Sequence, residues 1–323
     1  MRLEHFLYVV EIAEHRSLSK AARNLYITQP SLSVSLQNLE NELGFQVFER
    51  SHKGMVLTEK GREFYQIAKR IKGELDRVDR LVAPEDNPAE VHLNAAPVFC
   101  NAAMLQLISS VRGESQEIQL SINECTRASV LDAVVEHQAD LGIGICIDDE
   151  EKQLYQNAQQ CHVMIEPLIH DRMYLYIPKR HMLAFEESIP LARLQEDGII
   201  VLKEAGKNAH IANHKGGYSY TFAERDSVIK AVSKGMGYAV LPGMMAIDNV
   251  YIETGLVNVV PIADGVIPAT MYLAFSSAEP LTKNQALVAQ HIRTVSRHIQ
   301  QRLDYLPKLK HKADKTNLPS IYY

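Results

Sequence analysis

The feature that most constrains this chain is a run of three helical segments at its N-terminus, of which the third opens on small polar side chains. Apolar residues at positions 3, 6, 7, 10 and 13 have the spacing of one buried stripe on a first helix. Ser17 and Ser19 can cap a second helix, which ends at Asn24. Its adjacent Ala21 and Ala22 are small enough for a neighbouring helix to approach closely. The sequence therefore predicts that the first two helices pack against a third helix, which completes their hydrophobic core.

The third helix follows a tight turn at residues 25–28. Thr28 can cap it, and Pro30 fits its first turn because that position needs no backbone donor. Leucines at positions 32, 36, 39 and 43 bury one side, and Gly44 ends the helix. The helix start and the opposite side keep small or polar residues: Gln29, Ser31, Ser33, Val34 and Gln37.

This order of elements is the helix-turn-helix arrangement, whose last helix fits the major groove of DNA. Residues 47–58 then predict a β-hairpin, or wing, that carries Arg50 and Lys53. Taken singly, a leucine stripe is ordinarily core and a Ser/Gln face is ordinarily solvated, but the combination in this order indicates a DNA-binding domain. The residues predicted to contact double-stranded DNA are Ser19, Lys20, Thr28, Gln29, Pro30, Ser31, Ser33, Val34, Gln37, Arg50 and Lys53.

Beyond the wing, apolar residues recur at intervals of three or four, which is the spacing of a coiled-coil seam. They are Phe64, Ile67, Ile71, Leu75, Val78 and Val82. Either this helix pairs two copies of the chain, or its stripe packs against its own domain. Two closely spaced prolines, Pro84 and Pro88, then mark the strongest domain boundary.

The rest of the chain alternates short β-branched runs with helical patterns. Strands are expected at residues 91–95, 118–122, 141–145, 173–177, 198–202, 239–242, 257–261 and 269–275. Helices are expected between many of them, and a last amphipathic helix is expected at 281–303. Alternation of this kind predicts βα units around mostly parallel sheets.

Composition narrows the class of protein. Hydrophobic residues make up 46% and charged residues 23% of the chain, which is ordinary for a globular protein and excludes a largely disordered one. No apolar run approaches the roughly 20 residues of a transmembrane helix, and the start lacks the layout of a signal peptide. We therefore predict a cytoplasmic protein with no membrane partner. The net charge of −5 does not favour nucleic-acid binding, so that prediction depends on local clusters of Lys and Arg.

Signals for catalysis, metals or cofactors are incomplete, so we predict no enzyme, no metal and no cofactor. His210 and His214 are four residues apart, but no third ligand is indicated, and Gly216-Gly217 interrupts any helix. The cysteines match no metal or redox spacing and are expected to be ordinary small apolar residues. They are Cys100, Cys125, Cys146 and Cys161. A redox-sensing pair among them is the alternative.

Four N-terminal segments match the pattern of a known family. They are Ser17-Leu18-Ser19-Lys20-Ala21-Ala22, Ile27-Thr28-Gln29-Pro30-Ser31-Leu32-Ser33, Phe48-Glu49-Arg50 and Leu57-Thr58-Glu59-Lys60-Gly61. Together they resemble LysR-type transcriptional regulators, and residues 139–143 and 232–242 extend the resemblance thinly into the C-terminal part. Val34 is a departure, because many members of the family have Arg at this place.

The resemblance implies a multidomain fold: an N-terminal all-α winged helix-turn-helix with a linker helix, then an α/β periplasmic-binding-protein-like (type 2) effector domain of two subdomains. The expected boundaries are 1–60 for the DNA-binding domain, 61–88 for a dimerising linker helix and hinge, 89–163 plus 264–303 for effector subdomain 1, and 164–263 for effector subdomain 2. Residues 304–323 are expected to form a mobile basic tail. The implied partners are DNA, a small-molecule effector, further copies of the chain in a dimer or tetramer, and RNA polymerase.

Loops after three predicted strands form the expected effector cleft, because ligands of open α/β sheets bind beyond the carboxyl ends of the strands. The effector-binding residues predicted there are Pro97, Val98, Phe99, Asn101, Thr126, Arg127 and Ala205. The fixed charge of Arg127 favours an anionic effector. We therefore expect a DNA-binding regulator whose binding or bending of DNA changes with the effector. The alternatives are a thiol-based redox sensor and a solute-binding protein that does not bind DNA.

Overall fold

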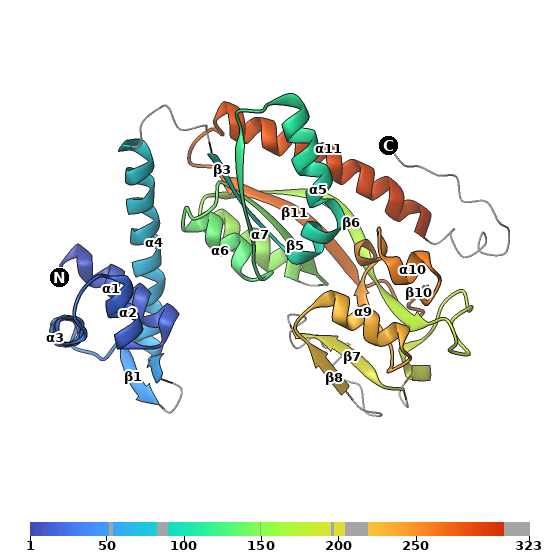
Figure 1. Cartoon of the computed structure of the whole chain (residues 1–323), viewed down its shortest axis with the longest axis horizontal. Coiled ribbons are helices and arrows are strands. Elements are labelled where there is room, and N and C mark those ends of the chain that lie inside the picture. The colour runs from blue at the N-terminus through green and yellow to red at the C-terminus, as the bar shows by residue number, and fades with distance from the viewer. Residues whose placement is uncertain (52–53, 83–89, 149, 195–196, 204–218, 307–323) are drawn as a thin grey trace. The chain divides into compact units, whose positions relative to one another are not determined.

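The structure, a computed structural model, describes residues 1–51, 54–82, 90–148, 150–194, 197–203 and 219–306. The chain divides into two compact units (Figure 1). The first comprises Met1–Asn87 with Asp132–Ala139, and the second comprises Pro88–Leu131 with Asp140–Tyr323. Most of the predicted tail, residues 307–323, lies outside the described residues.

In the first unit, three helices precede a two-stranded hairpin and a long helix. The elements are α1 (Leu3–His15), α2 (Leu18–Asn24), α3 (Gln29–Leu43), β1 (Phe48–Ser51), β2 (Gly54–Leu57) and α4 (Glu59–Val82). Strands β1 and β2 pair antiparallel, with Phe48 opposite Leu57 and Ser51 opposite Gly54. This arrangement confirms the three helices and the wing predicted from the sequence.

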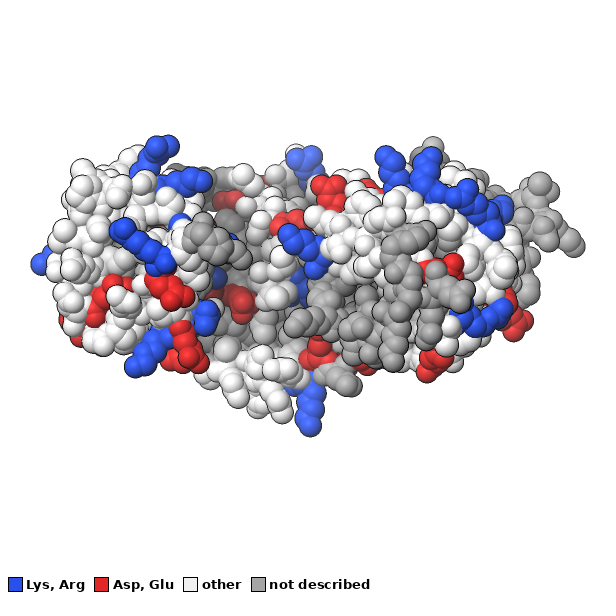
Figure 2. Space-filling view, turned by 90° about the horizontal axis from the view of Figure 1, so that it is seen from below, with Lys and Arg blue, Asp and Glu red and all other residues white. Residues whose placement is uncertain are grey.

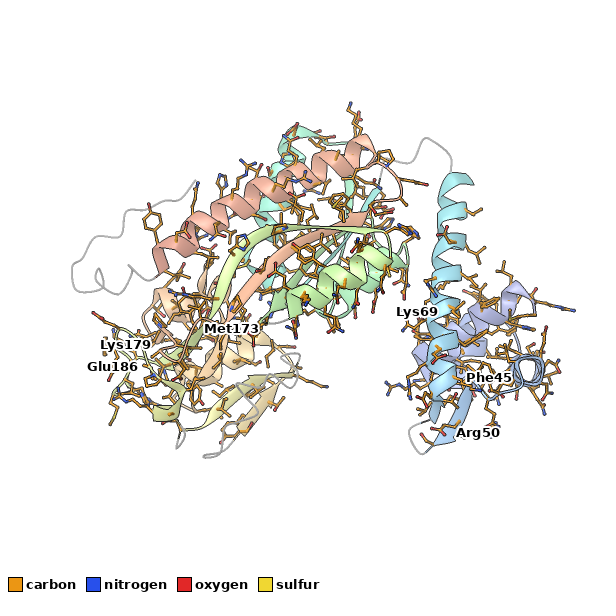
Figure 3. The ribbon with its side chains drawn as sticks, turned by 180° about the vertical axis from the view of Figure 1, so that it is seen from behind. Phe45, Arg50, Lys69, Met173, Lys179 and Glu186 are labelled. Atoms are coloured by element: carbon orange, nitrogen blue, oxygen red, sulfur yellow. The ribbon has the colours of Figure 1, made fainter. Side chains whose placement is uncertain are left out.

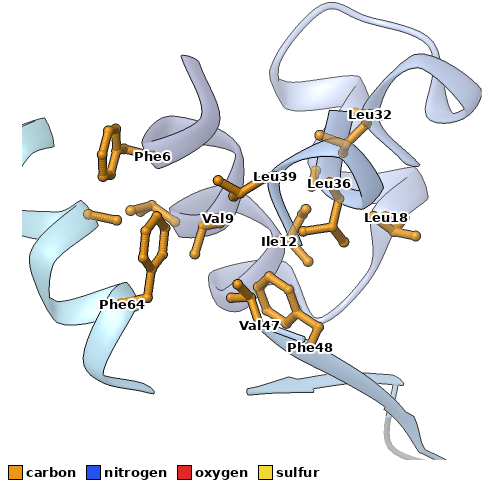
Figure 4. Close-up of a cluster of buried hydrophobic side chains, with 14 residues drawn as sticks. Phe6, Val9, Ile12, Leu18, Leu32, Leu36, Leu39, Val47, Phe48 and Phe64 are labelled. Atoms are coloured by element: carbon orange, nitrogen blue, oxygen red, sulfur yellow. The ribbon is translucent and has the colours of Figure 1, made fainter. Parts of the chain in front are cut away.

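The core of the first unit joins the apolar faces of the three helices to β1 and α4 (Figure 4). Val9, Ile12 and Leu32 have no exposed surface. The Phe6 and Phe64 rings stack with their centroids 5.4 Å apart and their planes within 9°. Burying a side chain of this size contributes about 1.5–3 kcal/mol, so Phe64 attaches the start of α4 firmly to the winged helix-turn-helix.

The apolar stripe of α4 has two environments. Phe64 is buried, and Ile71 packs against the core of the first unit. Ile67 and Val78 are instead 44% and 51% exposed. The alternative in which the stripe packs against its own domain therefore holds for Phe64 and Ile71, whereas the same helix leaves apolar surface exposed at Ile67 and Val78.

The second unit is built on a seven-stranded sheet in the order β10-β6-β11-β5-β3-β4, with β9 also pairing with β6. Its strands are β3 (Glu90–Ala95), β4 (Gln119–Glu124), β5 (Leu141–Ile147), β6 (Val163–Pro178), β9 (Ala239–Pro242), β10 (Val257–Pro261) and β11 (Pro268–Ser276). Strands β7 (Ile199–Leu202) and β8 (Ser219–Phe222) form a separate parallel pair.

The pairing directions correct one prediction. Strand β3 pairs parallel with β4 and β5, but β11 pairs antiparallel with β5 and β6, and β6 pairs antiparallel with β9 and β10. The expectation of mostly parallel sheets is therefore wrong. Short β-branched runs indicate buried strands, but they do not specify which neighbour each strand meets or in which direction.

The helices that follow β3 in the chain are α5 (Pro97–Glu114), α6 (Ser129–Val135), α7 (Glu150–Gln160), α9 (Arg225–Ser233), α10 (Val250–Glu253) and α11 (Lys283–Tyr305). Helix α11 lies alongside α5 (Figure 1). His291 links them, because its Nδ1 is 2.7 Å from the Ser110 hydroxyl and its Nε2 is 3.0 Å from a Glu114 carboxylate oxygen. This group braces the two helices.

Strand β6 connects the two halves of the large sheet. Its residues 163–172 pair with β11, and its residues 173–178 pair with β9 and β10. Asp171 lies next to this point and accepts the backbone N–H groups of Arg172 at 2.7 Å and Met244 at 2.8 Å. Burial raises the pKa of Asp171 to about 6, although these N–H donors oppose the shift.

Among the described helices, none has both the length and the hydropathy to span a membrane.

Candidate nucleic-acid interface and effector cavity

The N-terminal turn of α3 is held in place by local hydrogen bonds. The Thr28 hydroxyl caps the helix by accepting the Ser31 N–H at 3.3 Å, and Pro30 occupies the first turn. The Ser19 hydroxyl on α2 donates to the Gln29 side-chain oxygen at 2.8 Å. Ser17, and not Ser19, caps α2. The side chains of Ser19 and Gln29 are therefore fixed to each other across the turn between α2 and α3.

Most of the predicted DNA-contacting residues lie on the surface of this unit. Those that are exposed are Ser19, Lys20, Thr28, Gln29, Pro30, Ser31, Val34, Gln37 and Arg50. Ser33 is half-buried, and Lys53 lies outside the described residues. Val34 is 56% exposed. The buried leucines of α3 turn the opposite face inward, so a polar edge of this helix is free to meet a groove.

The wing is locked to the helices by buried backbone donors. The Glu40 carboxylate on α3 accepts the N–H groups of Val47 and Phe48 at 2.8 and 3.1 Å. The Met55 N–H donates to the carbonyl of Arg16 at 3.0 Å. Arg50 lies on β1 in the wing (Figure 3). These bonds fix the position of Arg50 relative to α3, which a two-part DNA contact requires.

Sequence reasoning did not select Tyr26, which lies in the turn between α2 and α3. Its side chain is 96% exposed, and its backbone has the left-handed φ of 56°. A large aromatic ring held out of a turn next to the recognition helix can contact a DNA backbone or base. The sequence did offer a signal for Tyr26, because an aromatic residue stands in a segment predicted to be a turn, where its side chain is expected to be exposed.

Charges of both signs lie on the face of the molecule that Figure 2 draws. Figure 2 shows Lys and Arg side chains interspersed with Asp and Glu side chains over the face that it draws. The face drawn there therefore carries no broad patch of positive charge alone.

A cavity of about 230 Å³ lies in the second unit. It is lined by Pro97, Asn101, Glu124, Leu202, Ala223, Glu224, Arg225 and Asp226. These residues come from the N-terminal ends of α5 and α9 and from the ends of β4 and β7. The cavity thus lies where strands end and helices begin, which is the expected place for a ligand in an α/β sheet.

The structure places the predicted effector residues in different environments. Pro97 and Asn101 line the cavity, whereas Val98 and Phe99 are 6% and 0% exposed and belong to the core. The Thr126 hydroxyl is 2.7 Å from that of Ser129. Ala205 lies outside the described residues, as do His210 and His214.

Arg127 does not line this cavity. Its guanidinium donates to the Glu150 carboxylate at 2.8 Å. The same carboxylate oxygen accepts the Ile147 N–H at 3.0 Å, which holds Glu150 in place at the start of α7. The positive charge at the cavity comes instead from Arg225, the first residue of α9, whose side chain is only 9% exposed. Sequence reasoning missed Arg225.

Two of the four thiols, those of Cys100 and Cys146, differ from those of a typical redox switch. All four cysteines are thiols in the structure. Burial raises the pKa of Cys100 to about 12 and that of Cys146 to about 11. Because the thiolate is the reactive form, these two side chains are poor nucleophiles, which weighs against the redox alternative for them.

Two family profiles match this chain. The profile described as "Bacterial regulatory helix-turn-helix protein, lysR family" matches residues 3–62, and the "LysR substrate binding domain" matches residues 85–297. A relative in Escherichia coli (strain K12), the uncharacterized HTH-type transcriptional regulator YnfL, is 23% identical over 91% of this chain and 97% of its own. BenM from Acinetobacter baylyi is 32% identical over 45% of this chain and 48% of its own.

Solved structures share the fold over almost the whole length. Full-length OxyR from Pseudomonas aeruginosa has a TM-score of 0.52 and 22% identity, covering 91% of this chain and 100% of that one. Full-length CbnR in complex with its target DNA has a TM-score of 0.56 and 16% identity, with the same coverage. The substrate-binding profile alone spans more than half of the chain. The chain therefore belongs to the LysR family of bacterial transcriptional regulators and carries a helix-turn-helix DNA-binding domain followed by an effector-binding domain.

Proposed function

We propose that this regulator reads DNA sequence with the N-terminal turn and polar edge of α3. Gln29, Ser33 and Gln37 are spaced by four residues and lie along this edge, where they reach base edges in the major groove. Lys20 and the wing residues Arg50 and Lys53 contact phosphates. The observation that carries the proposal is the pair of hydrogen bonds from the wing to Glu40, because they hold Arg50 and α3 in one fixed arrangement.

The test is selection of genomic DNA fragments by the full-length protein at near-physiological salt, followed by footprinting. We expect two protected half-sites related by a dyad. Gln37→Ala should weaken binding to the selected site by about 1–3 kcal/mol per lost base contact and leave non-specific binding unchanged. Asn41→Ala is the matched control, because Asn41 is exposed near the C-terminal end of the same helix. Diffuse binding that disappears as salt rises, with no protected site, would refute sequence reading by α3.

We further propose that the protein acts as a dimer paired through α4, and as a tetramer in its DNA complex. Ile67 and Val78 support this proposal, because both are exposed apolar residues, whereas the other apolar residues of this helix up to Leu75 are half-buried or buried. The same proposal includes the domain boundaries expected from the sequence and a contact with RNA polymerase. It also includes a cytoplasmic location and the lack of catalytic activity. Sedimentation of the wild type and of Ile67→Glu tests the pairing, and an unchanged mass for the variant would contradict it.

The second part of the proposed function concerns regulation. The cavity between the starts of α5 and α9 holds a small-molecule effector, and its occupation changes DNA binding or bending. Such a ligand shifts the protein only to the extent that it binds the two arrangements unequally. Footprints recorded with and without the effector show whether its binding changes the protection or the bending of the DNA.

A further inference from the structure

The turn between α2 and α3 is a tight helix end closed by backbone hydrogen bonds. The Tyr26 N–H donates to the carbonyl of Arg23 at 3.2 Å. The Ile27 N–H donates to the carbonyl of Ala22 at 3.0 Å. These two bonds form the Schellman pattern of a helix C-terminus, which requires a left-handed backbone at the position of Tyr26.

Tyrosine is a costly residue for this position. The φ of Tyr26 is 56°, where a side chain is crowded by the backbone. Glycine and asparagine adopt the same conformation with less strain, and they are the usual residues at such helix ends. Strained backbone that persists in a folded protein is concentrated at functional sites. The tyrosine side chain is therefore a candidate for a function that offsets its cost.

The Tyr26 side chain is held outward and does not contribute to the core. Leu25 and Ile27, on either side of it, are half-buried and pack against the core of the first unit. The Tyr26 side chain is 96% exposed. Among the described residues, none forms a hydrogen bond with its hydroxyl group. The anchored neighbours therefore present a phenol group to solvent from one fixed place.

Two cations lie on the helix that leads into this turn. Lys20 and Arg23 are exposed and are three residues apart on α2, so they share one face of that helix. Neither side chain forms an ion pair with a carboxylate of the described residues. The Cα atom of Tyr26 lies at most about 7 Å from that of Thr28, because two residues span no more than that. The phenol and the cations thus stand beside the capping residue of α3.

We propose that Tyr26 and Arg23 form a phosphate-binding surface for DNA beside the groove that α3 enters. The Tyr26 hydroxyl donates to a phosphate oxygen, and the Arg23 guanidinium pairs with a neighbouring phosphate. The first residues of a recognition helix meet base edges, so the turn before that helix lies over the sugar–phosphate backbone. Tyrosine and arginine are both common donors to phosphate. The inference rests on the proposed function, in which α3 enters the major groove.

The experiment measures the affinity of the full-length protein for two duplexes of equal length at several salt concentrations. One is a genomic fragment selected in the footprinting experiment, and the other has a random sequence. Tyr26→Phe removes only the hydroxyl group and should weaken binding to both duplexes by the same factor, about fivefold or more. The loss should be equal because a phosphate contact carries no sequence information. Arg23→Gln should also weaken both and should lower the log–log salt slope by about 0.9.

Tyr26→Asn separates a DNA contact from structural damage. Asparagine suits the left-handed backbone, so the melting temperature of this variant should equal or exceed that of the wild type. Its DNA affinity should nevertheless fall at least as much as that of Tyr26→Phe. His162→Asn is the matched control, because His162 is also exposed and has a left-handed φ of 54° but belongs to the second unit. It should bind both duplexes as the wild type does.

The inference is wrong if Tyr26→Phe binds the random-sequence duplex as tightly as the wild type. A loss confined to the selected fragment would also overturn it, because it would assign Tyr26 to a base. An unchanged salt slope in Arg23→Gln would remove Arg23 from the surface. The random-sequence duplex contains no selected site, so these results are distinguishable from those on the proposed function. Equal losses on both duplexes without any protected dyad site would keep the phosphate contact and remove sequence reading by α3.

Discussion

Substitution of Gly54 by alanine should loosen the contact between the wing and the helix-turn-helix, because it adds a single methyl group where the two meet. Gly54 begins β2 with a φ of +97°. A Cβ placed there would lie 2.3 Å from the carbonyl oxygen of Arg16, which is the acceptor of the Met55 N–H. Gly54→Ala therefore introduces backbone strain, forces that carbonyl away and breaks the hydrogen bond from Met55.

The size of the effect follows from two terms. Holding an alanine at a left-handed φ costs roughly 1–2 kcal/mol, and a lost backbone hydrogen bond costs about 1 kcal/mol, or more if the N–H stays buried. The total for Gly54→Ala is about 2–4 kcal/mol. Gly44→Ala is the matched control, because Gly44 also has a positive φ of +74° but has no atom within 4 Å of the added Cβ. Its cost is the strain alone, about 1–2 kcal/mol.

Hydrogen exchange of the full-length protein is the suitable assay, because the sequence contains no tryptophan to report by fluorescence. If the cost falls on local opening of the wing, exchange at Met55 should rise by about 30-fold to 1,000-fold in Gly54→Ala. In Gly44→Ala the amide of Met55 should stay near its wild-type rate. DNA affinity should fall in Gly54→Ala, since Arg50 lies on the strand that is released. Wild-type exchange at Met55 in Gly54→Ala would refute the reasoning.

Three further changes have expected outcomes. Leu36→Ala empties a core position that is 7% exposed and should destabilise the first unit by about 2–5 kcal/mol, which calorimetry checks; a loss under about 1 kcal/mol would contradict full packing there. Val34→Arg should tighten DNA binding and steepen the salt dependence by about 0.9 in log–log slope; an unchanged slope would mean that position 34 does not face phosphate. Asp171 has a folded-state pKa raised to about 6 from 3.8. The free energy of unfolding should therefore be highest at low pH and should fall as the pH rises from about 4 to about 6, by at most about 3 kcal/mol. Asp171→Asn should flatten that part of the pH profile of the unfolding free energy, and a profile identical to that of the wild type would contradict the assignment.

The N-terminal unit could be predicted closely because its structure is encoded locally. Thr28 and Gly44 mark the ends of α3 by their capping chemistry, and the leucines of α3 specify its buried face within a few residues of one another. The Glu40 contact with the wing could not be predicted in the same way. It depends on how the loop after Gly44 returns β1 to the side of α3, and a glutamate at this place is equally compatible with a solvated helix.

The sheet of the second unit was predicted less well, because strand pairing is not a local property. The first half of β6 was missed, since Pro167 lacks an N–H and is typical of a strand end. The structure accommodates Pro167 beside a register shift, where it lies opposite Tyr272 on β11. Strand β11 then enters between β5 and β6, which makes much of the sheet antiparallel.

The cavity of the second unit shows where prediction of a charged lining from the sequence stops. Pro97 and Asn101, which the rule that ligands bind beyond strand ends selected, line the cavity, and their contact with an effector stays a prediction. The rule failed to identify the cation, because Arg127 and Arg225 are equally basic in sequence and differ only in their tertiary partners. Glu150 engages Arg127 from the start of α7, where the Ile147 N–H holds that carboxylate. Arg225 instead forms an ion pair with Glu124, from a distant part of the chain, with 3.9 Å between the nearest nitrogen and oxygen, and it lines the cavity. Which of the two arginines lines the cavity is therefore decided by tertiary packing, which the sequence around each arginine does not reveal.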